Sequence, residues 1–316
     1  MTVRAVTVPT PADIDAAWAV VAERLTPTPL VPAPALGADV HLKLETLQPT
    51  GSFKVRGALA ALSRAGGEAV ITASAGNAGL GLAWAAAELG VDATVVVAAT
   101  ASPAKVAALR ALPVTLIVHG RGYDEAEAHA LALAAEGATF VSPYNDTGVI
   151  AGQATIGREL DVQLPAPATV ACPVGGGGLA SGLGLWASGR PGARVVGVEA
   201  ERSPSFVSAL RAGELVQIEV GETLADGLGG NIEPGAVTFE LVRDRVADVT
   251  TVSEAEIEEA IRFLARAHGL VAEGAGAAAV AAVMAGRVAP DGGPLVVLVT
   301  GRNIALPRLA AVLAGG

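Results

Sequence analysis

Hydrophobic and polar residues alternate with two different periods along this chain of 316 residues. Between residues 40 and 44 every second residue is apolar, which predicts a strand, whereas the apolar residues between 55 and 62 recur at the spacing of a helix. Further short runs rich in β-branched residues predict strands at 70–72, 94–97, 114–118, 139–141, 169–171, 195–198 and 295–299. Helical spacing lies between them, at 79–89, 123–135, 254–267 and 304–313, and proline-rich stretches predict turns at 27–34 and 165–167. Continuous apolar strands separated by helices indicate parallel sheets covered on both faces, and hence an α/β protein.

Composition and charge narrow the class of partner. Hydrophobic residues make up 52% of the chain, which is enough for two lobes with cores of their own. The formal net charge is −10 and the basic residues do not cluster, so no nucleic acid is expected to bind. The longest run of small apolar residues, 275–284, is far shorter than the ~20 residues that a membrane-spanning helix needs. We therefore expect a small-molecule partner and no membrane segment.

The single cysteine bears on the cellular compartment. Cys172 has no second cysteine with which to form an internal disulfide, which points to a reducing compartment. It lies between the apolar run 168–170 and Pro173, the setting of a buried strand residue. Residues 1–10 contain one arginine and no continuous apolar run, unlike a signal peptide. These features predict a cytoplasmic protein.

The segment from Lys43 to Ala58, which reads KLETLQPTGSFKVRGA, contains the main catalytic candidate, Lys54. A Gly-Ser turn separates the predicted strand from the predicted helix and places Lys54 at the start of that helix. An ammonium group beside the positive end of a helix dipole is disfavoured, so we expect a lowered pKa and a neutral amine that can attack a carbonyl. A solvated surface lysine is the alternative.

Four consecutive glycines, Gly175, Gly176, Gly177 and Gly178, follow the strand predicted at 169–171. Directly before a helix, such a loop leaves backbone N–H groups free to converge on a phosphate. A flexible turn is the alternative, although one or two glycines suffice for an ordinary turn. The loop does not fit Gly-x-Gly-x-x-Gly and is not followed by Gly-Lys-Ser/Thr, so neither a dinucleotide site nor a P-loop is supported.

Several motifs occur in the same order as in the threonine dehydratase and serine racemase family, which are pyridoxal-phosphate (PLP) enzymes of fold type II. Segment 43–58 resembles the lysine motif of that family, Ser-Ala-Gly-Asn at 74–77 its substrate loop and 175–179 its phosphate cup. The remaining matches are Ile-Ala-Gly-Gln at 150–153, Ala-Asp-Gly-Leu at 225–228, Glu-Gly-Ala-Gly at 273–276 and Thr-Gly-Arg-Asn at 300–303. The resemblance thus covers most of the chain.

This resemblance implies a fold of two lobes, each with a mostly parallel sheet covered by helices. The large PLP-binding lobe is expected to comprise residues 1–67 and 143–316, and the small lobe with the substrate loop residues 68–142. PLP as the cofactor, an amino acid as the substrate and a homodimer as the assembly are implied in the same way.

The roles of individual residues follow from the same resemblance. Lys54 is expected to bind PLP covalently and then to remove the α proton of the substrate as a general base. The other residues expected to bind the cofactor are Phe53, Asn77, Gly175, Gly176, Gly177, Gly178, Leu179 and Thr300. The residues expected to bind the substrate are Ser74, Ala75, Gly76 and Asn77. Asn77 could equally cap the helix that follows it, and Thr300 could cap the helix expected from 304.

Two positions favour elimination over racemisation. Racemases of the family carry a serine at the position of Ala75, and its hydroxyl serves as the acid/base on the opposite face of the substrate. Thr300 would meet the pyridine nitrogen with a hydroxyl, which cannot protonate that nitrogen as a carboxylate partner would and so favours rapid loss of the β substituent. The chain is therefore expected to be a threonine/serine dehydratase, an ammonia-lyase that converts L-threonine to 2-oxobutyrate and L-serine to pyruvate.

Departures from the family pattern keep other functions open. Ala78 stands in place of the usual histidine, Tyr144 in place of a common phenylalanine and Arg302 in place of the more frequent glycine. The alternatives are a serine racemase, a dehydratase of another β-hydroxy amino acid and a PLP-binding sensor without turnover. Glu199 matches the first ligand of the family's divalent-metal site, but Ser205 stands where the second carboxylate would be, so no metal site is expected.

Overall fold

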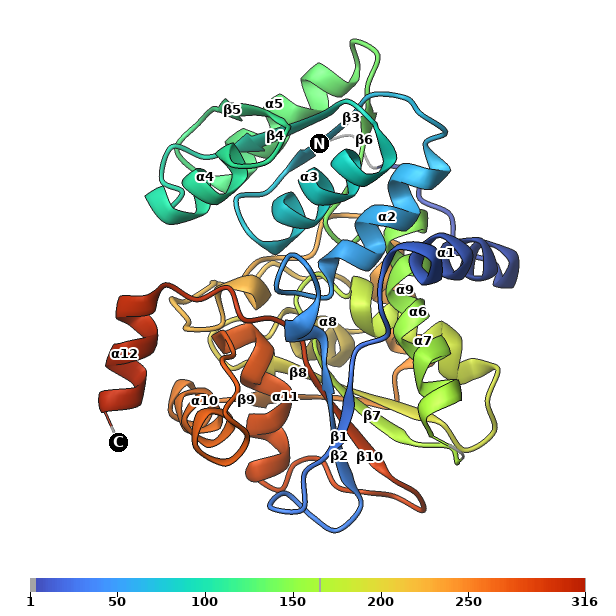
Figure 1. Ribbon diagram of the computed structural model, residues 1–316, viewed down its shortest axis with the longest axis vertical. Helices are drawn as coiled ribbons and strands as arrows, with labels where there is room; N and C mark the ends of the chain where they lie inside the picture. The colour runs from blue at the N-terminus through green and yellow to red at the C-terminus, as the bar shows by residue number, and fades with distance from the viewer. Residues whose placement is uncertain (1–3, 165, 316) are drawn as a thin grey trace.

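The structure, a computed structural model, describes residues 4–164 and 166–315. The N-terminal segment 1–10 and the turn predicted at 165–167 therefore lie partly outside the described residues. Within the described residues ten strands form two separate sheets, one of six strands and one of four, and helices surround both (Figure 1).

The six-stranded sheet lies in the lower part of Figure 1. In spatial order its strands are β1 (Leu30–Pro32), β2 (Val40–Leu44), β10 (Leu295–Val299), β7 (Thr169–Pro173), β8 (Arg194–Ala200) and β9 (Asp248–Val252). Neighbouring strands are parallel except for β1, which is antiparallel to β2. All five residues of β10 are apolar and buried, as a strand covered on both faces requires.

The four-stranded sheet lies in the upper part of Figure 1 and is parallel throughout. In spatial order its strands are β5 (Thr115–Val118), β4 (Ala93–Val97), β3 (Val70–Ala73) and β6 (Thr139–Phe140). The two sheets confirm the predicted α/β class with mostly parallel sheets. The exact lobe boundaries stay a prediction, although every strand of this sheet comes from residues 68–142.

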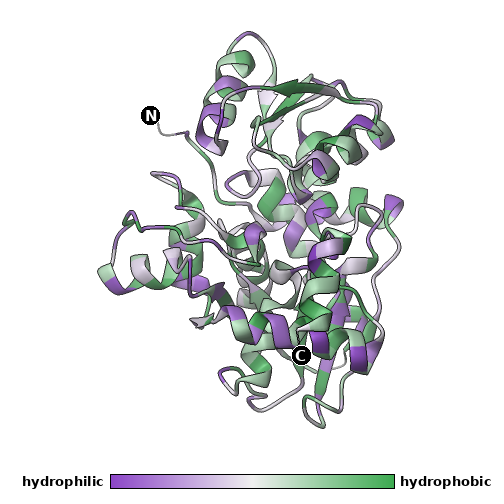
Figure 2. Cartoon of the chain, turned by 90° about the vertical axis from the view of Figure 1, so that its left-hand side faces the viewer, coloured by the Kyte–Doolittle hydropathy of each residue, from purple (hydrophilic) through white to green (hydrophobic). Residues whose placement is uncertain are grey.

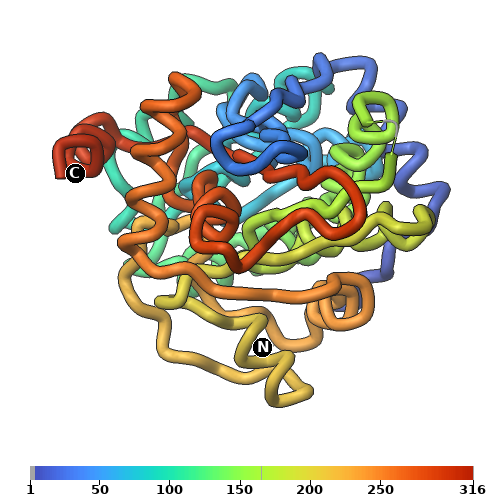
Figure 3. The backbone as a smooth tube through the Cα atoms, turned by 90° about the horizontal axis from the view of Figure 1, so that it is seen from below, coloured from blue at the N-terminus to red at the C-terminus, as the bar shows by residue number. Residues whose placement is uncertain are grey.

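Twelve α-helices and two short 3-10 helices occur in the described residues. The α-helices are α1 (Pro11–Arg24), α2 (Lys54–Arg64), α3 (Asn77–Leu89), α4 (Pro103–Arg110), α5 (Tyr123–Ala134), α6 (Thr147–Gln163), α7 (Gly178–Ser188), α8 (Ser205–Ala212), α9 (Val237–Arg245), α10 (Glu254–His268), α11 (Gly274–Met284) and α12 (Leu306–Ala314). The 3-10 helices are η1 (Glu45–Leu47) and η2 (Asp226–Leu228). Helix α12 lies at the edge of the molecule in two views (Figures 1 and 3).

Local chemistry accounts for several helix ends. Thr10 and Ser253 each form a capping box, with Asp13 and Glu256 respectively, at the starts of α1 and α10. Gly90 ends α3 in the left-handed conformation that a glycine adopts without strain.

Each strand predicted from the sequence is present within two residues of its expected ends. The prediction of a turn at 27–34 was incomplete, because this stretch contains the edge strand β1, where Pro32 is tolerated. The helix expected at 304–313 begins later, at Leu306, directly before a proline in its first turn.

Hydrophobic residues are frequent in the strands and in the helices that surround them (Figure 2), and many of them are buried. The core of the four-stranded sheet includes Val95 and Leu82 together with Leu59 and Leu62 of α2. Helix α2 therefore shares the core of the small sheet, where it packs against α3, although strand β2 of the large sheet precedes it in the chain. Cys172 is fully buried in β7 as predicted, and burial raises the pKa of its thiol to about 12. No helix among the described residues is long and apolar enough to cross a membrane.

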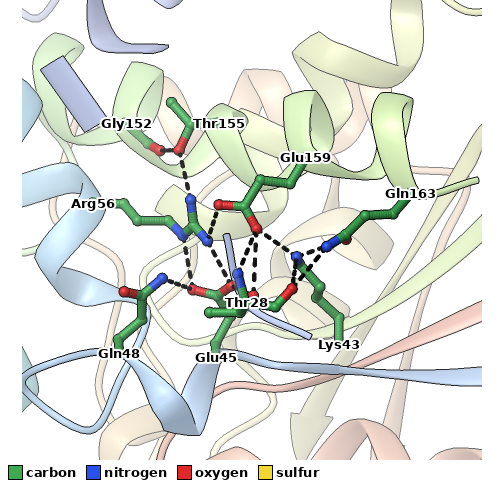
Figure 4. A network of polar contacts seen from close by, with 9 residues as sticks. All are labelled: Thr28, Lys43, Glu45, Gln48, Arg56, Gly152, Thr155, Glu159 and Gln163. Carbon is green, nitrogen blue, oxygen red and sulfur yellow. Dashed lines mark hydrogen bonds and ion pairs between the residues drawn. The ribbon is translucent and has the colours of Figure 1, made fainter. Parts of the chain in front are cut away.

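A buried network of charged groups connects α2 to α6 and to the end of β2 (Figure 4). Arg56 of α2 pairs with Glu45 at 2.8 Å and with Glu159 of α6 at 2.6 Å, and Lys43 pairs with Glu159 at 2.5 Å. The four side chains are at most 2% exposed, and Thr28 donates to Glu45 through its hydroxyl and to Glu159 through its backbone N–H. Two cations and two anions balance one another, so no net charge is buried.

Candidate active site

Lys54 is the first residue of α2, as the sequence predicted, and the turn before it is fixed by the turn that follows β10. The backbone N–H of Phe53 donates to the carbonyl of Thr300 at 3.1 Å, and that of Arg302 donates to the carbonyl of Gly51 at 2.9 Å. Strands β2 and β10 are parallel neighbours, so their carboxyl ends lie side by side and bring the two turns together.

The side chain of Lys54 is half-buried, and its Nζ donates a hydrogen bond to the carbonyl of Pro143 at 2.7 Å. Burial lowers the pKa of Lys54 from 10.5 to about 8, while the nearby carboxyl of Glu273 acts in the opposite direction. The predicted direction is confirmed, and burial of the amine is the main cause. A neutral amine is therefore well populated near pH 8.

Amide and carboxyl groups connect three turns of the site. Asn303 Nδ2 donates to Asn77 Oδ1 at 2.6 Å and to the carbonyl of Thr50 at 2.8 Å. Asn77 Nδ2 in turn donates to Glu273 Oε1 at 2.6 Å. Gly76 occupies the N-cap position of α3 and Asn77 is its first residue, so the helix-cap alternative for Asn77 was wrong. The Asn77 side chain bonds within the site instead.

Glu273 is a site residue that the sequence analysis missed. Glu273 is only 6% exposed, and burial raises the pKa of its carboxyl to about 7 although Asn77 donates a hydrogen bond to it. The matched motif at 273–276 contained the residue, and an acidic residue within an otherwise small and apolar segment was the available signal.

The glycine loop is shaped by close contacts. A Cβ at Gly176 would lie 2.2 Å from Cγ of Tyr144, and a Cβ at Gly177 would lie 2.5 Å from Cζ of Phe206. Gly177 also has a φ of +87°, which favours glycine. Helix α7 begins at Gly178, so the N–H groups of its first turn have no partner within the helix and can bind an anion. These contacts argue against the flexible-turn alternative.

The turns described above border one cavity of about 1010 Å³. It lies at the carboxyl ends of β3, β7 and β10, where ligands bind in open parallel sheets. Its lining includes every predicted site residue: Phe53, Lys54, Ser74, Ala75, Gly76, Asn77, Gly175, Gly176, Gly177, Gly178, Leu179 and Thr300. The structure thus brings all of them together, while their individual roles stay proposals.

The structure shows where the side chains of Thr300 and Arg302 lie in the turn after β10. Thr300 is buried beside the cavity, and its hydroxyl lies 3.5 Å from the carbonyl of Ala275. It does not cap α12, because that helix begins at Leu306 with Ala305 as its N-cap residue. Arg302 is exposed, donates to the carbonyl of Thr46 and is not among the residues that line the cavity.

Glu199, the expected first ligand of a metal site, supports α8 in this structure. Its two carboxylate oxygens accept hydrogen bonds from the N–H groups of Phe206 and Val207, each at 2.8 Å. Burial raises the pKa of Glu199 to about 7, and Ser205 donates to the carbonyl of Gly230 at 2.5 Å. In the described part of the chain no three His, Cys, Asp or Glu side chains gather to hold a metal ion. The lack of a metal site stays a prediction.

Two mostly parallel sheets, with a lysine at a helix start facing a glycine loop across one cavity, define the class of fold type II PLP enzymes. The family described as pyridoxal-phosphate dependent enzymes matches residues 21–301, and the chain belongs to this family. Its cofactor is therefore pyridoxal phosphate.

Relatives and solved structures agree with this class. The chain is 41% identical over 286 residues to the L-threonine ammonia-lyase of Thermotoga maritima, covering 89% of this chain and 71% of that protein. It is 36% identical to a catabolic L-threonine dehydratase of Staphylococcus aureus, covering 96% and 92%. Maize serine racemase superposes with a TM-score of 0.89 at 26% identity, covering 98% of both chains. The processed form of threonine deaminase isoform 2 from Solanum lycopersicum has a TM-score of 0.87 at 30% identity, covering 100% and 92%.

Proposed function

We propose that this protein is a PLP-dependent threonine/serine dehydratase. It would convert L-threonine to 2-oxobutyrate and ammonia, and L-serine to pyruvate and ammonia. The observation that carries the proposal is one cavity that holds the amine of Lys54, with its lowered pKa, and a substrate loop with Ala75 in place of a hydroxyl residue. The names of relatives at 36–41% identity support the same reaction.

The residues present fit the cofactor. The N-terminus of α7 and the loop 175–179 offer N–H groups to its phosphate, in a cradle whose shape depends on glycine because a Cβ at Gly176 or Gly177 would collide with the ring of Tyr144 or Phe206. Lys54 would hold it covalently, Phe53 would lie against the ring, and Asn77 and Thr300 would contact the 3-oxygen and the pyridine nitrogen. When bound, pyridoxal phosphate supplies an electron sink for the carbanion that forms at the α carbon.

The chain's own groups then bind the substrate and move its proton. The loop of Ser74 to Asn77 ends at the N-terminus of α3, where N–H groups favour the substrate carboxylate. The N–H of Gly76 donates to Ser74 Oγ at 3.2 Å, which keeps this loop in shape. Lys54 Nζ takes the α proton from one face, and its pKa of about 8 makes the neutral base available at moderate pH. Ala75 offers no acid on the other face.

The test is a direct assay of 2-oxo acid and ammonia from L-threonine and L-serine with added PLP. Release of both products from L-threonine is expected, and Lys54→Ala should reduce kcat by at least about 10³-fold, because no other base replaces it. Near-full activity in Lys54→Ala would contradict the assignment of the lysine.

Chiral analysis of L-serine after incubation separates the dehydratase from a racemase. The dehydratase should yield pyruvate without D-serine, whereas D-serine as the main product would identify an isomerase. Visible cofactor absorbance without product from either amino acid would favour another β-hydroxy substrate or a PLP-binding sensor. We further propose that the protein is cytoplasmic and that residues 68–142 form its small lobe. We also propose that it forms a homodimer, which analytical ultracentrifugation tests.

A further inference from the structure

A second, much smaller cavity adjoins Lys54. Its volume is about 10 Å³, and it lies where α2, α3 and α6 meet the end of β6. Side chains or backbone of Lys54, Ala78, Ser142, Pro143 and Gln153 contribute to its wall. A volume of this size accommodates one water molecule, which is stable in a cavity when two to four polar groups bond to it.

Gln153, the last residue of the Ile-Ala-Gly-Gln motif, contributes a buried amide without hydrogen-bond partners to this wall. It is 1% exposed, and within the described part of the chain neither Oε1 nor Nε2 has a hydrogen-bond partner. A buried amide without partners costs about 1–3 kcal/mol for each unsatisfied group. The packing is nevertheless specific, because Nε2 lies 2.3 Å from the position of a Cβ on Gly57, one turn after Lys54. Only glycine at residue 57 leaves room for the amide.

We propose that Gln153 holds one ordered water in this cavity and thereby positions the amino group of Lys54. The Nζ of Lys54 directs one hydrogen to the carbonyl of Pro143 at 2.7 Å, and an ammonium has two more to give. Ser142 Oγ accepts from the N–H of Asn145 at 3.2 Å, and no described residue accepts its own hydrogen. Gln153, Lys54 and Ser142 together supply the polar partners that such a water needs.

If Gln153 holds a water beside Lys54, replacing Gln153 should change the pKa of Lys54, which a purely packing role would not do. A water that accepts from the Lys54 ammonium stabilises the charged form, so its loss should lower the pKa of Lys54. Gln153→Met keeps the size of the side chain but removes both polar atoms, and a shift of about 0.5 to 1 pH unit downward is expected. Gln153→Glu places an anion near the amine and should shift the pKa upward.

The experiment measures the rate at which the apoenzyme captures PLP at Lys54 as a function of pH, from the rise of visible absorbance. Reduction with borohydride followed by peptide mass spectrometry confirms that Lys54 is the residue modified. Gln163→Met is the matched control, because Gln163 also lies on α6 but bonds to Lys43 and to the carbonyl of Thr28, away from Lys54. Opposite shifts in the two Gln153 variants, with none in the control, would support the proposal.

A high-resolution crystal structure provides an independent readout. It should show one water within hydrogen-bond distance of the Gln153 amide and Lys54 Nζ. Unchanged pH profiles in both Gln153 variants, or a dry cavity, would overturn the inference. The inference rests on the proposed role of Lys54 as the cofactor-binding lysine, yet the assay needs no substrate. PLP attached elsewhere would refute that role, whereas capture at Lys54 with unshifted profiles would refute only the role of Gln153.

Discussion

At the scale of single residues, the protonation of Glu273 in the site affects the free energy of unfolding of the protein. Burial raises the pKa of its carboxyl from 4.5 to about 7, so the folded apoprotein keeps a proton that the unfolded chain releases at lower pH. The free energy of unfolding should therefore fall as pH rises from about 4.5 to 7, by about 3 kcal/mol for this group. Glu273→Gln keeps an oxygen that accepts from Asn77 but removes the charge, so it should lack this part of the fall.

Denaturant unfolding of the apoprotein at pH 5 and pH 8 measures this effect. The wild type should lose more stability between the two pH values than Glu273→Gln does. Glu222→Gln is the control, because Glu222 lines the same cavity but is exposed to solvent. Equal losses in all three proteins would mean that water reaches the Glu273 carboxyl in the folded state.

The glycine loop allows a second prediction for a single residue. Gly176→Ala would place a Cβ 2.2 Å from the ring of Tyr144, so either the ring or the loop must move. Overpacking of this kind costs about 1–3 kcal/mol, and we expect the Kd for PLP to rise by about tenfold or more. Titration of the apoenzyme with PLP measures this. Gly122→Ala, where an added Cβ meets no atom within 4 Å, should bind PLP as the wild type does, and an unchanged Kd in Gly176→Ala would contradict the cradle.

At the scale of elements, the buried charge network of Figure 4 fixes α2 relative to α6, and so fixes the helix that begins with Lys54. Glu159 bonds to both Lys43 and Arg56. Glu159→Gln leaves two buried cations with one carboxylate, and a loss of about 3–5 kcal/mol in unfolding free energy is expected. Urea unfolding tests this, with Glu23→Gln as the control.

The control removes a charge from an exposed pair with Arg24, where little change is expected because water screens the interaction. Equal effects of the two substitutions would show that the network does not stabilise the packing of α2 on α6. If Glu159→Gln lost stability but its folded fraction still bound PLP normally, the network would stabilise α2 without being needed for the reaction of Lys54 with PLP.

The same elements show what could be predicted from the sequence. Strand β10 and the helix after Lys54 were predictable because their apolar spacing is regular, and Lys54 because a turn and a helix start determine its position. Glu273 and Gln153 were not assigned roles, because only the folded chain brings α11 beside Asn77 and α6 beside Gly57. Strand β1 was not predicted because its three residues lie within a proline-rich stretch and pair only at an edge.

At the scale of the whole molecule, the cavity between the two sheets has more acidic than basic side chains in its lining. The acidic side chains are Asp124, Glu127, Glu222, Asp226, Glu233 and Glu273, and the basic ones are Lys54, Lys105 and Arg308. Lys105 of α4 is paired with Asp226 of η2 at 2.6 Å, so this ion pair connects the small sheet's side of the cavity to the large sheet's side. A substrate with a second carboxylate would meet repulsion and would have to compete with Asp226 for Lys105.

Substrate charge therefore provides the last prediction. We expect kcat/KM for L-3-hydroxyaspartate to be at least about 100-fold below that for L-threonine, since like charges brought together cost several kcal/mol. Asp226→Ala releases Lys105 and should raise the ratio of the two kcat/KM values in favour of 3-hydroxyaspartate by about tenfold. Asp124→Ala removes a carboxylate from the cavity lining without releasing Lys105, so it should change the ratio less. Only Asp226→Ala frees a cation, Lys105, for the substrate. Equal changes of the ratio in the two variants would therefore mean that the net charge of the cavity, and not the ion pair, governs selectivity.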